Sequence, residues 1–245
     1  MPNVYISPSL QEYNPYVGGG NEEYYMNLVA DELVPYLSNS GVTYTRNDPS
    51  DKLIDVINES NEENYDLHLA IHSNAAGSEN AGNVRGTDVY YYPGSEKGER
   101  FADLIVEEFK KIYPNPDLVK KVPTTTLAEV RRVNAPSVLV EVAYHDNPDD
   151  AMWIRNNINN IGRSLATAIT EYLGVPLIGS SNSNQGTVVT QTSALNIRRD
   201  PSTGAEIIGQ IPKGAIVKIF GKLNDWYSIE YDGKKGYASS HYIRF

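Results

Sequence analysis

The residues best suited to chemistry are one histidine and two carboxylates, each near the end of a predicted element. His72 closes an apolar strand in His72-Ser73-Asn74-Ala75, where a rigidly held imidazole can bind a metal ion. Glu141 closes a second apolar strand, where burial would raise the carboxyl pKa and suit it to general acid and base catalysis. Glu22 opens a helix after three glycines. Each also has a structural interpretation: a hydrogen-bonded core histidine, a paired carboxylate, and a charge that stabilises a helix N-terminus.

The composition restricts the ligands that a metal site can use. The chain has 245 residues and no cysteine, which excludes disulfides, a cysteine nucleophile and thiolate zinc sites. Its four histidines are His68, His72, His145 and His241. Because His68 lies inside the same apolar strand as His72, we expect it to be a core residue. A metal ion would need imidazole, carboxylate, amide or water ligands.

Strand-like and helical segments alternate through the first 174 residues and must position these side chains. The patterns predict strands at 4–6, 42–45, 67–71, 87–92 and 137–140, and helices at 22–37, 96–112 and 148–173. Pro35 should kink or cut the first helix. The alternation predicts an α/β domain with a mostly parallel, twisted sheet and flanking helices. Ligands bind such sheets beyond the carboxyl ends of strands, where Gln11, His72 and Glu141 lie.

A change of composition divides the chain. Residues 179–185 are small and polar, which predicts a linker between a domain of residues 1–178 and a second domain of residues 186–245. The second part has short β-rich runs separated by turns, including the hairpin signal Asp232-Gly233. We therefore predict a small all-β barrel there.

Charge and hydropathy exclude several classes of partner. The net charge is −10, and residues 186–245 hold 8 basic and 5 acidic residues against 13 and 26 in the rest. An acidic body argues against nucleic acid. No apolar run approaches the ~18 residues of a membrane helix, so we expect no membrane partner. The first residues lack the pattern of a secretory signal, so we expect none.

The order of the motifs resembles that of the zinc-dependent N-acetylmuramoyl-L-alanine amidases of the Amidase_3 type, over about residues 2–174. The resemblance rests on Glu22 at the head of the first helix, the His-Ser-Asn-Ala segment, Gly86-Thr87-Asp88-Val89-Tyr90, and Ala135-Pro136-Ser137-Val138-Leu139-Val140-Glu141. It implies a zinc enzyme that cleaves peptidoglycan between N-acetylmuramic acid and the L-alanine of the stem peptide.

The resemblance also implies roles for individual residues. Glu22 and His72 would be zinc ligands, and Glu141 would act on the attacking water. Asn74 and Arg131 would contact the substrate in the groove.

The first ligand of the family is missing from its usual loop. That ligand is a histidine in Asp-Pro-Gly-His-Gly-Gly, whereas this chain has Ser7-Pro8-Ser9-Leu10-Gln11-Glu12. Gln11 can offer a carbonyl oxygen and is our first candidate for the third ligand. His145 is the second candidate and could instead contact the substrate. Glu12 is the third.

The last part, over about residues 186–245, resembles a bacterial SH3 (SH3b) module, as in Asp225-Trp226-Tyr227-Ser228-Ile229 and Gly236-Tyr237-Ala238-Ser239. Such modules commonly bind cell-wall peptide or glycan, and Trp226 could be a ligand platform or a core residue. The whole resembles a phage endolysin or a bacterial autolysin. The first resemblance implies synthesis in the host cytoplasm, release at lysis by a holin, and action at the bacterial cell wall. Two alternatives stay open: a wall-binding protein with a degenerate metal site, and an endopeptidase that cuts within the stem peptide.

Overall fold

The computed structural model describes residues 1–178, 184–191, 193–223 and 225–244 and divides into two compact units, residues 1–179 and 180–245. The predicted linker, residues 179–185, spans this division. Its residues 179–183 lie outside the described residues. Asn184 and Gln185 instead open a strand that pairs along residues 218–219, so they belong to the sheet of the second unit. The predicted limits at 178 and 186 stay a prediction.

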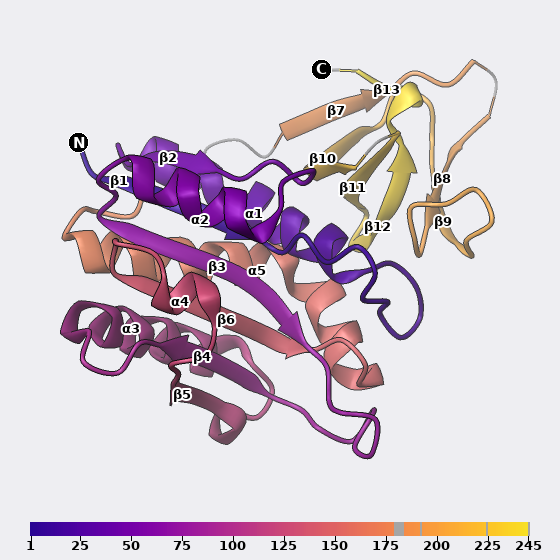
Figure 1. The fold of residues 1–245 in the computed structure, drawn as a ribbon. Helices are drawn as coiled ribbons and strands as arrows, with labels where there is room; N and C mark the ends of the chain where they lie inside the picture. The colour runs from indigo at the N-terminus through magenta and orange to yellow at the C-terminus, as the bar shows by residue number, and fades with distance from the viewer. Residues whose placement is uncertain (179–183, 192, 224, 245) are drawn as a thin grey trace. The chain divides into compact units, whose positions relative to one another are not determined.

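A six-stranded sheet forms the centre of the first unit's described residues (Figure 1). Its order is β2 (Thr43–Arg46), β1 (Asn3–Pro8), β3 (Leu67–Asn74), β6 (Ser137–Tyr144), β4 (Thr87–Tyr91) and β5 (Val119–Pro123). Neighbouring strands are parallel except β4 and β6, which run antiparallel. The predicted α/β fold with a mostly parallel sheet is confirmed.

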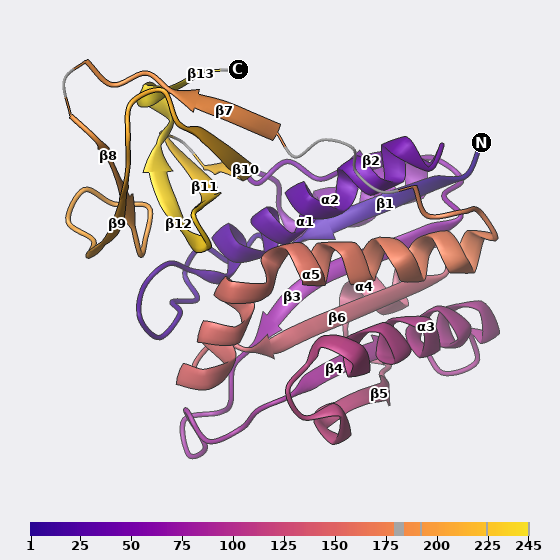
Figure 2. The ribbon, with the colours of Figure 1, turned by 180° about the vertical axis from the view of Figure 1, so that it is seen from behind.

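Helices cover both faces of this sheet. α1 (Glu22–Asn39), α3 (Glu96–Ile112) and α5 (Pro148–Leu173) pack together on one face, which Figure 2 shows. α2 (Leu53–Glu62) packs through Val56 on Tyr5, and the short α4 (Ala128–Arg131) packs through Val130 on Ala70. Tyr5 pairs in register with His68, and Ala70 lies two residues after His68 on the same strand. Tyr5 and Ala70 therefore lie on the same, second face of the sheet. The turn η1 (Pro116–Leu118) leads into β5. None of the described helices is long and apolar enough to cross a membrane.

Local chemistry sets the helix ends. Asn147 accepts hydrogen bonds from the backbone N–H groups of residues 149 and 150, Pro148 takes the first helical position, and Gly174 ends α5 in the left-handed conformation. Of the two expectations for Pro35, that it cuts α1 is wrong, since α1 continues to Asn39, and that it kinks α1 stays a prediction. Proline here removes one hydrogen bond near the end of the helix, and burial of Leu37 beyond it favours continuation.

The described residues of the second unit form an antiparallel sheet, as the prediction of an all-β module requires. Its strand order is β13 (Ile243–Arg244), β7 (Asn184–Val188), β10 (Ile216–Leu223), β11 (Trp226–Tyr231), β12 (Lys234–Ser239), β8 (Leu195–Arg198) and β9 (Ile207–Ile211), with a turn η2 (Ser240–Tyr242) before β13. Ile197, Ile211, Val217 and Ile229 are among the residues of its buried core. The predicted hairpin at Asp232-Gly233 joins β11 to β12.

Candidate active site

A glycine loop fixes the start of α1. Gly18, Gly19 and Gly20 have φ values of 86°, 107° and 78°, which residues with a Cβ rarely adopt. A Cβ on Gly20 would also lie 2.6 Å from the ring of Tyr25. Arg155 of α5 holds the loop by donating hydrogen bonds to the carbonyls of Val17 and Gly19. The loop therefore has one conformation, from which α1 begins.

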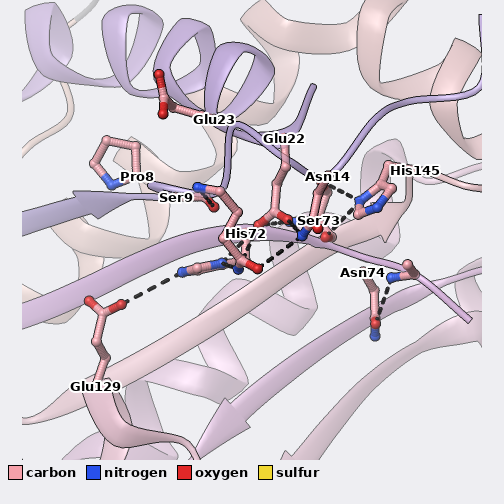
Figure 3. A network of polar contacts seen from close by, with 12 residues as sticks. Pro8, Ser9, Asn14, Glu22, Glu23, His72, Ser73, Asn74, Glu129 and His145 are labelled. Carbon is pink, nitrogen blue, oxygen red and sulfur yellow. Dashed lines mark hydrogen bonds and ion pairs between the residues drawn. The ribbon is translucent and has the colours of Figure 1, made fainter. Parts of the chain in front are cut away.

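The start of α1 places the side chain of Glu22 in the protein interior (Figure 3). Asn21 caps the helix through the Tyr24 N–H, and Glu22 follows it, fully buried. Its Oε1 lies 2.8 Å from His72 Nδ1, and its Oε2 accepts a hydrogen bond of 2.7 Å from Asn14 Nδ2. Burial alone would raise the pKa of Glu22, but the hydrogen bonds from His72 and Asn14 outweigh it and hold this pKa below 4.5. Glu22 is therefore an anion held in place from both oxygens.

His72 lies on β3, which continues two residues past it to Asn74, whereas the sequence predicts that the strand ends at His72. Its side chain is 12% exposed, Nδ1 faces Glu22, and Nε2 is buried without a hydrogen-bond partner. Burial would lower the pKa of His72, but the carboxylates of Glu129 and Glu22 raise it well above 6.5. His72 is therefore a cation in the protein alone, and a metal ion would have to displace its Nδ1 proton.

Gln11 completes a triangle with these two residues. Its Nε2 lies 3.2 Å from His72 Nδ1 and 3.5 Å from Glu22 Oε1. Its Oε1 accepts a hydrogen bond of 2.9 Å from Asn14 Nδ2. The loop after β1 thus brings an amide, not an imidazole, to the carboxylate–imidazole pair.

The triangle fits a zinc ion in its dimensions. Two ligand atoms about 2.0–2.1 Å from a tetrahedral zinc ion stand roughly 3.3–3.4 Å apart, and the three separations are 2.8, 3.2 and 3.5 Å. The Gln11 amide would have to turn to present its oxygen, which would cost the Asn14 hydrogen bond. Within the described residues, no three His, Asp or Glu side chains form a metal-binding group. An amide as third ligand is consistent with that result.

Glu141 lies beside this triangle on the neighbouring strand. In register, His72 of β3 pairs with Glu141 of β6, which pairs with Asp88 of β4, so the three side chains form a row on one face. Glu141 Oε2 is buried without a hydrogen-bond partner. Burial, the largest cause, and the nearby carboxylates of Glu22 and Asp88 together raise the pKa of Glu141 to about 7, against the opposing effect of His72. Such a carboxyl can both accept and donate a proton near neutral pH.

This raised pKa predicts a pH-dependent stability for the metal-free protein. The folded pKa is about 7 against an ordinary value of 4.5. Between these values the folded state keeps a proton that the unfolded state has lost, so Glu141 lowers the free energy of unfolding as pH rises through this window. We expect Glu141→Gln to stabilise chelator-treated protein by about 3 kcal/mol at pH 8 and by little at pH 4.5.

Urea unfolding at the two pH values measures the difference. Glu79→Gln, which changes an exposed carboxylate, is the control. Equal stabilisation of the Glu141 variant at both pH values would contradict the raised pKa.

His145, the alternative third ligand, is buried away from the triangle. Its ring stacks on Tyr16 with 5.1 Å between ring centroids, and its Nδ1 lies 2.9 Å from the Ser73 carbonyl oxygen. Tyr16 donates a 2.6 Å hydrogen bond to Ser73 Oγ. In the described part of the chain no hydrogen bond or ion pair joins His145 to Glu22 or His72. The geometry favours Gln11, while a substrate contact by His145 stays a prediction.

The predicted substrate residues lie at different distances from this centre. Asn74 ends β3, partly exposed, and its Oδ1 accepts a hydrogen bond from the Ala75 N–H. Glu12 is exposed beside Gln11. Arg131 is exposed at the end of α4. It borders a cavity of about 540 Å³ that is also lined by Tyr92, which precedes α3, and by Lys97 in the first turn of α3. Their roles stay predictions.

Three polar residues near the centre were not predicted from the sequence. Asn14 bonds both Gln11 and Glu22, Asp88 lies next to Glu141, and Glu129 faces His72. Glu129 had a visible signal, since it is a carboxylate between apolar residues in Leu127-Ala128-Glu129-Val130. The expectation that His68 is a core histidine is confirmed, because it is fully buried and hydrogen-bonded.

Fold and site together define an α/β domain with a carboxylate–imidazole–amide cluster beside a second carboxylate on the two central strands of its sheet. The comparisons agree with this class. Residues 4–171 match the family model of N-acetylmuramoyl-L-alanine amidases, and residues 193–244 match that of bacterial SH3 domains. The chain belongs to the N-acetylmuramoyl-L-alanine amidase family and has a bacterial SH3 domain after it.

Individual similarities agree with this assignment. The chain is 33% identical over 64 residues to the putative N-acetylmuramoyl-L-alanine amidase YrvJ of Bacillus subtilis, over 26% of this chain and 12% of YrvJ. The match therefore spans about an eighth of that relative's length. The fold is similar to that of amidase AmiC2 of Nostoc punctiforme, with a TM-score of 0.61 and 22% identity over 71% of this chain and 97% of the other. An amidase of Clostridium difficile 630 has a TM-score of 0.63 and 17% identity over 71% and 97%.

Proposed function

We propose that the protein is a zinc-dependent N-acetylmuramoyl-L-alanine amidase that cleaves peptidoglycan between N-acetylmuramic acid and the L-alanine of the stem peptide. The observation that supports this most is the pairing of His72 with Glu141 across β3 and β6, with Glu22 in contact with His72. His72 can bind a metal ion together with Glu22, and Glu141 has a pKa of about 7. Family membership supplies the substrate class.

The residues divide the work of hydrolysis. Zinc held by Glu22, His72 and the Gln11 amide would polarise the scissile carbonyl and lower the pKa of the attacking water. Glu141 accepts a proton from that water as its oxygen bonds to the lactyl carbonyl carbon. As the carbon–nitrogen bond breaks, Glu141 donates the proton to the leaving amine of L-alanine. The unpartnered Oε2 of Glu141 is free for this transfer.

Digestion of purified walls tests the proposal. Mass analysis of the products should show stem peptides with a newly free amine on L-alanine, and a chelator should stop their release. An endopeptidase would leave L-alanine attached to the glycan and free another amine within the stem. A wall-binding protein with a degenerate metal site would release nothing and retain no zinc.

The third ligand can be tested by comparing two variants. We expect Gln11→Ala to weaken zinc binding at least roughly tenfold, since loss of even an outer-shell partner costs 10–100-fold. His145→Ala should keep zinc, because its ring bonds Ser73 and stacks on Tyr16. Competition with a chromophoric chelator measures both affinities.

The reverse pattern would make His145 the ligand, and unchanged affinity in both variants would reject both assignments. Gln11→His offers a nitrogen from the same loop and is the repair variant. It should bind zinc at least as tightly as the wild type if Gln11 coordinates.

The second unit supports a targeting role. It has a surface cavity of about 880 Å³, and Trp226, which lines it, lies outside the buried core cluster of the described residues. Trp226 and Tyr242 offer aromatic surface, while Arg198 and Arg244 add positive charge. We propose that this unit binds the wall and raises the local concentration of the catalytic unit.

Two fragments test this role. Residues 1–178 should cleave soluble muropeptides at near the full rate but digest intact walls more slowly, because tethering is lost. Residues 180–245, which keep all of β7, should sediment with walls, and Trp226→Ala should weaken this binding. Unchanged wall digestion by the shorter fragment, together with no binding by the tail, would contradict targeting.

A further inference from the structure

Next to His72, the side chains of Ser60, His68 and Glu129 form a buried series of polar contacts that the proposed mechanism does not use. Ser60 Oγ of α2 lies 2.8 Å from His68 Nδ1, and His68 Nε2 lies 3.0 Å from Glu129 Oε2. The other oxygen of this carboxylate, Oε1, lies 3.6 Å from His72 Nε2, an ion-pair contact that Figure 3 shows. Ser60 and His68 are fully buried, and Glu129 is 5% exposed. One carboxylate thus joins two imidazoles of the same strand.

Burial makes this carboxylate costly unless both of its oxygens are used. Its surroundings on this face are apolar, with Val130 packed on Ala70 and Leu139. An ionised carboxylate in such a place needs hydrogen-bond donors. Each oxygen of the Glu129 carboxylate faces an imidazole nitrogen, and a carboxylate oxygen accepts hydrogen bonds from such donors.

The contacts of Glu129 determine which nitrogen and oxygen atoms donate these hydrogen bonds. His68 must donate from Nε2 to Glu129, so its Nδ1 accepts from the Ser60 hydroxyl. The face-to-face ring of Tyr5, 5.2 Å away and tilted by 5°, fixes the plane of His68. Oε1 of Glu129 is left facing His72 Nε2, which has no hydrogen-bond partner at ordinary distance among the described residues. A small movement of either side chain would close this gap.

We propose that Glu129 is the positioning residue of His72: it holds the Nε2 proton, so that Nδ1 is the nitrogen presented to the ligand triangle. The inference rests on the proposed zinc site. His68 and Ser60 anchor Glu129 from the far side, and the ring of His72 is therefore held between two carboxylates, Glu129 at Nε2 and Glu22 at Nδ1. Carboxylates that accept from the outer nitrogen of a metal-bound histidine fix its tautomer and orientation.

Glu129→Gln is the first test, because it keeps the shape and removes the charge. An amide can accept from only one histidine while its NH₂ faces the other. We expect zinc affinity, measured by chelator competition, to fall 10–100-fold. Nitrogen-15 NMR of the histidine rings should show the His72 Nε2 proton as hydrogen-bonded and slow to exchange with water in the zinc-loaded wild type, and faster to exchange in the variant. Glu99→Gln, an exposed carboxylate paired with Lys121, is the matched control and should change neither.

A second variant separates a loss of zinc binding from a loss of the fold. Replacing His68 and Glu129 together by leucine removes the buried pair without leaving either partner alone. This protein should fold, shown by its thermal transition, and lose zinc affinity by the same factor. Affinity within threefold of wild type in a folded variant, with unchanged exchange of the His72 Nε2 proton, would overturn the proposal. A wild type that binds no zinc would instead contradict the proposed metal site, and exchange of the Nε2 proton in the metal-free protein would still decide whether Glu129 holds it.

Discussion

Glu141→Gln is expected to lower the rate of muropeptide hydrolysis by about 10²–10⁴-fold while the protein keeps its zinc and its fold. The amide has the size of the carboxyl but cannot accept a proton from water. Its position supports this result, because Oε2 of Glu141 is buried without a partner in the same row as His72. Glu141 lies outside the triangle of Gln11, Glu22 and His72, so its charge is not needed to hold the metal ion. Single-turnover rates and zinc content, measured on the same preparation, separate the two effects.

Glu79→Gln should leave both quantities unchanged, since Glu79 is an exposed residue on a loop. Retained activity in the Glu141 variant would move the general base elsewhere, with Glu12 and His145 as the next candidates. Loss of zinc along with activity would make Glu141 a ligand.

His72→Ala is expected to abolish zinc binding and wall lysis together. Its Nδ1 lies 2.8 Å from Glu22 and 3.2 Å from the Gln11 amide, so the triangle loses its only imidazole. A carboxylate and an amide are weaker zinc ligands than a set that includes histidine. Metal analysis after dialysis, together with release of soluble wall fragments, measures both losses.

His241→Ala is the matched control for metal content, because His241 is exposed in the second unit and pairs with Asp225. A fold check is needed, since removal of His72 leaves the fully buried Glu22 with one hydrogen-bond donor fewer. Wall lysis that survives in a folded His72→Ala protein would contradict the zinc mechanism.

Much of the fold follows from local patterns in the sequence. The helix of residues 96–112 has the bounds that its apolar periodicity predicts, and α5 begins and ends where Asn147 and Gly174 indicate. Strand ends were less predictable, since β3 and β6 continue past His72 and Glu141. Their continuation depends on pairing with each other, which no local pattern records. α2 was not predicted, and its burial comes from tertiary contacts such as Val56 on Tyr5.

The site was predictable where residue type and strand ends coincide. The structure brings Gln11, Glu22 and His72 together, with Glu141 beside them, as their places near the ends of elements suggested. The contributions of Asn14 and Glu129 could not be predicted, because they depend on how a loop and a four-residue helix fold back over the sheet. The position of His145 depends on Tyr16, which comes from a distant loop.

The contact between Arg155 and the loop before α1 can form only after residue 155 has been synthesised. The arginine holds the carbonyl of Gly19, 136 residues earlier in the chain. A ribosome that has translated β6 has already produced the proposed ligands and Glu141, but not the arginine of α5 that bonds this loop. Contacts between such distant positions form late, because closing a long loop costs chain entropy before the contact stabilises it. We therefore expect nascent chains that end before residue 155 to lack a working centre, so that the newly made polypeptide stays inert until α5 has been translated and has docked.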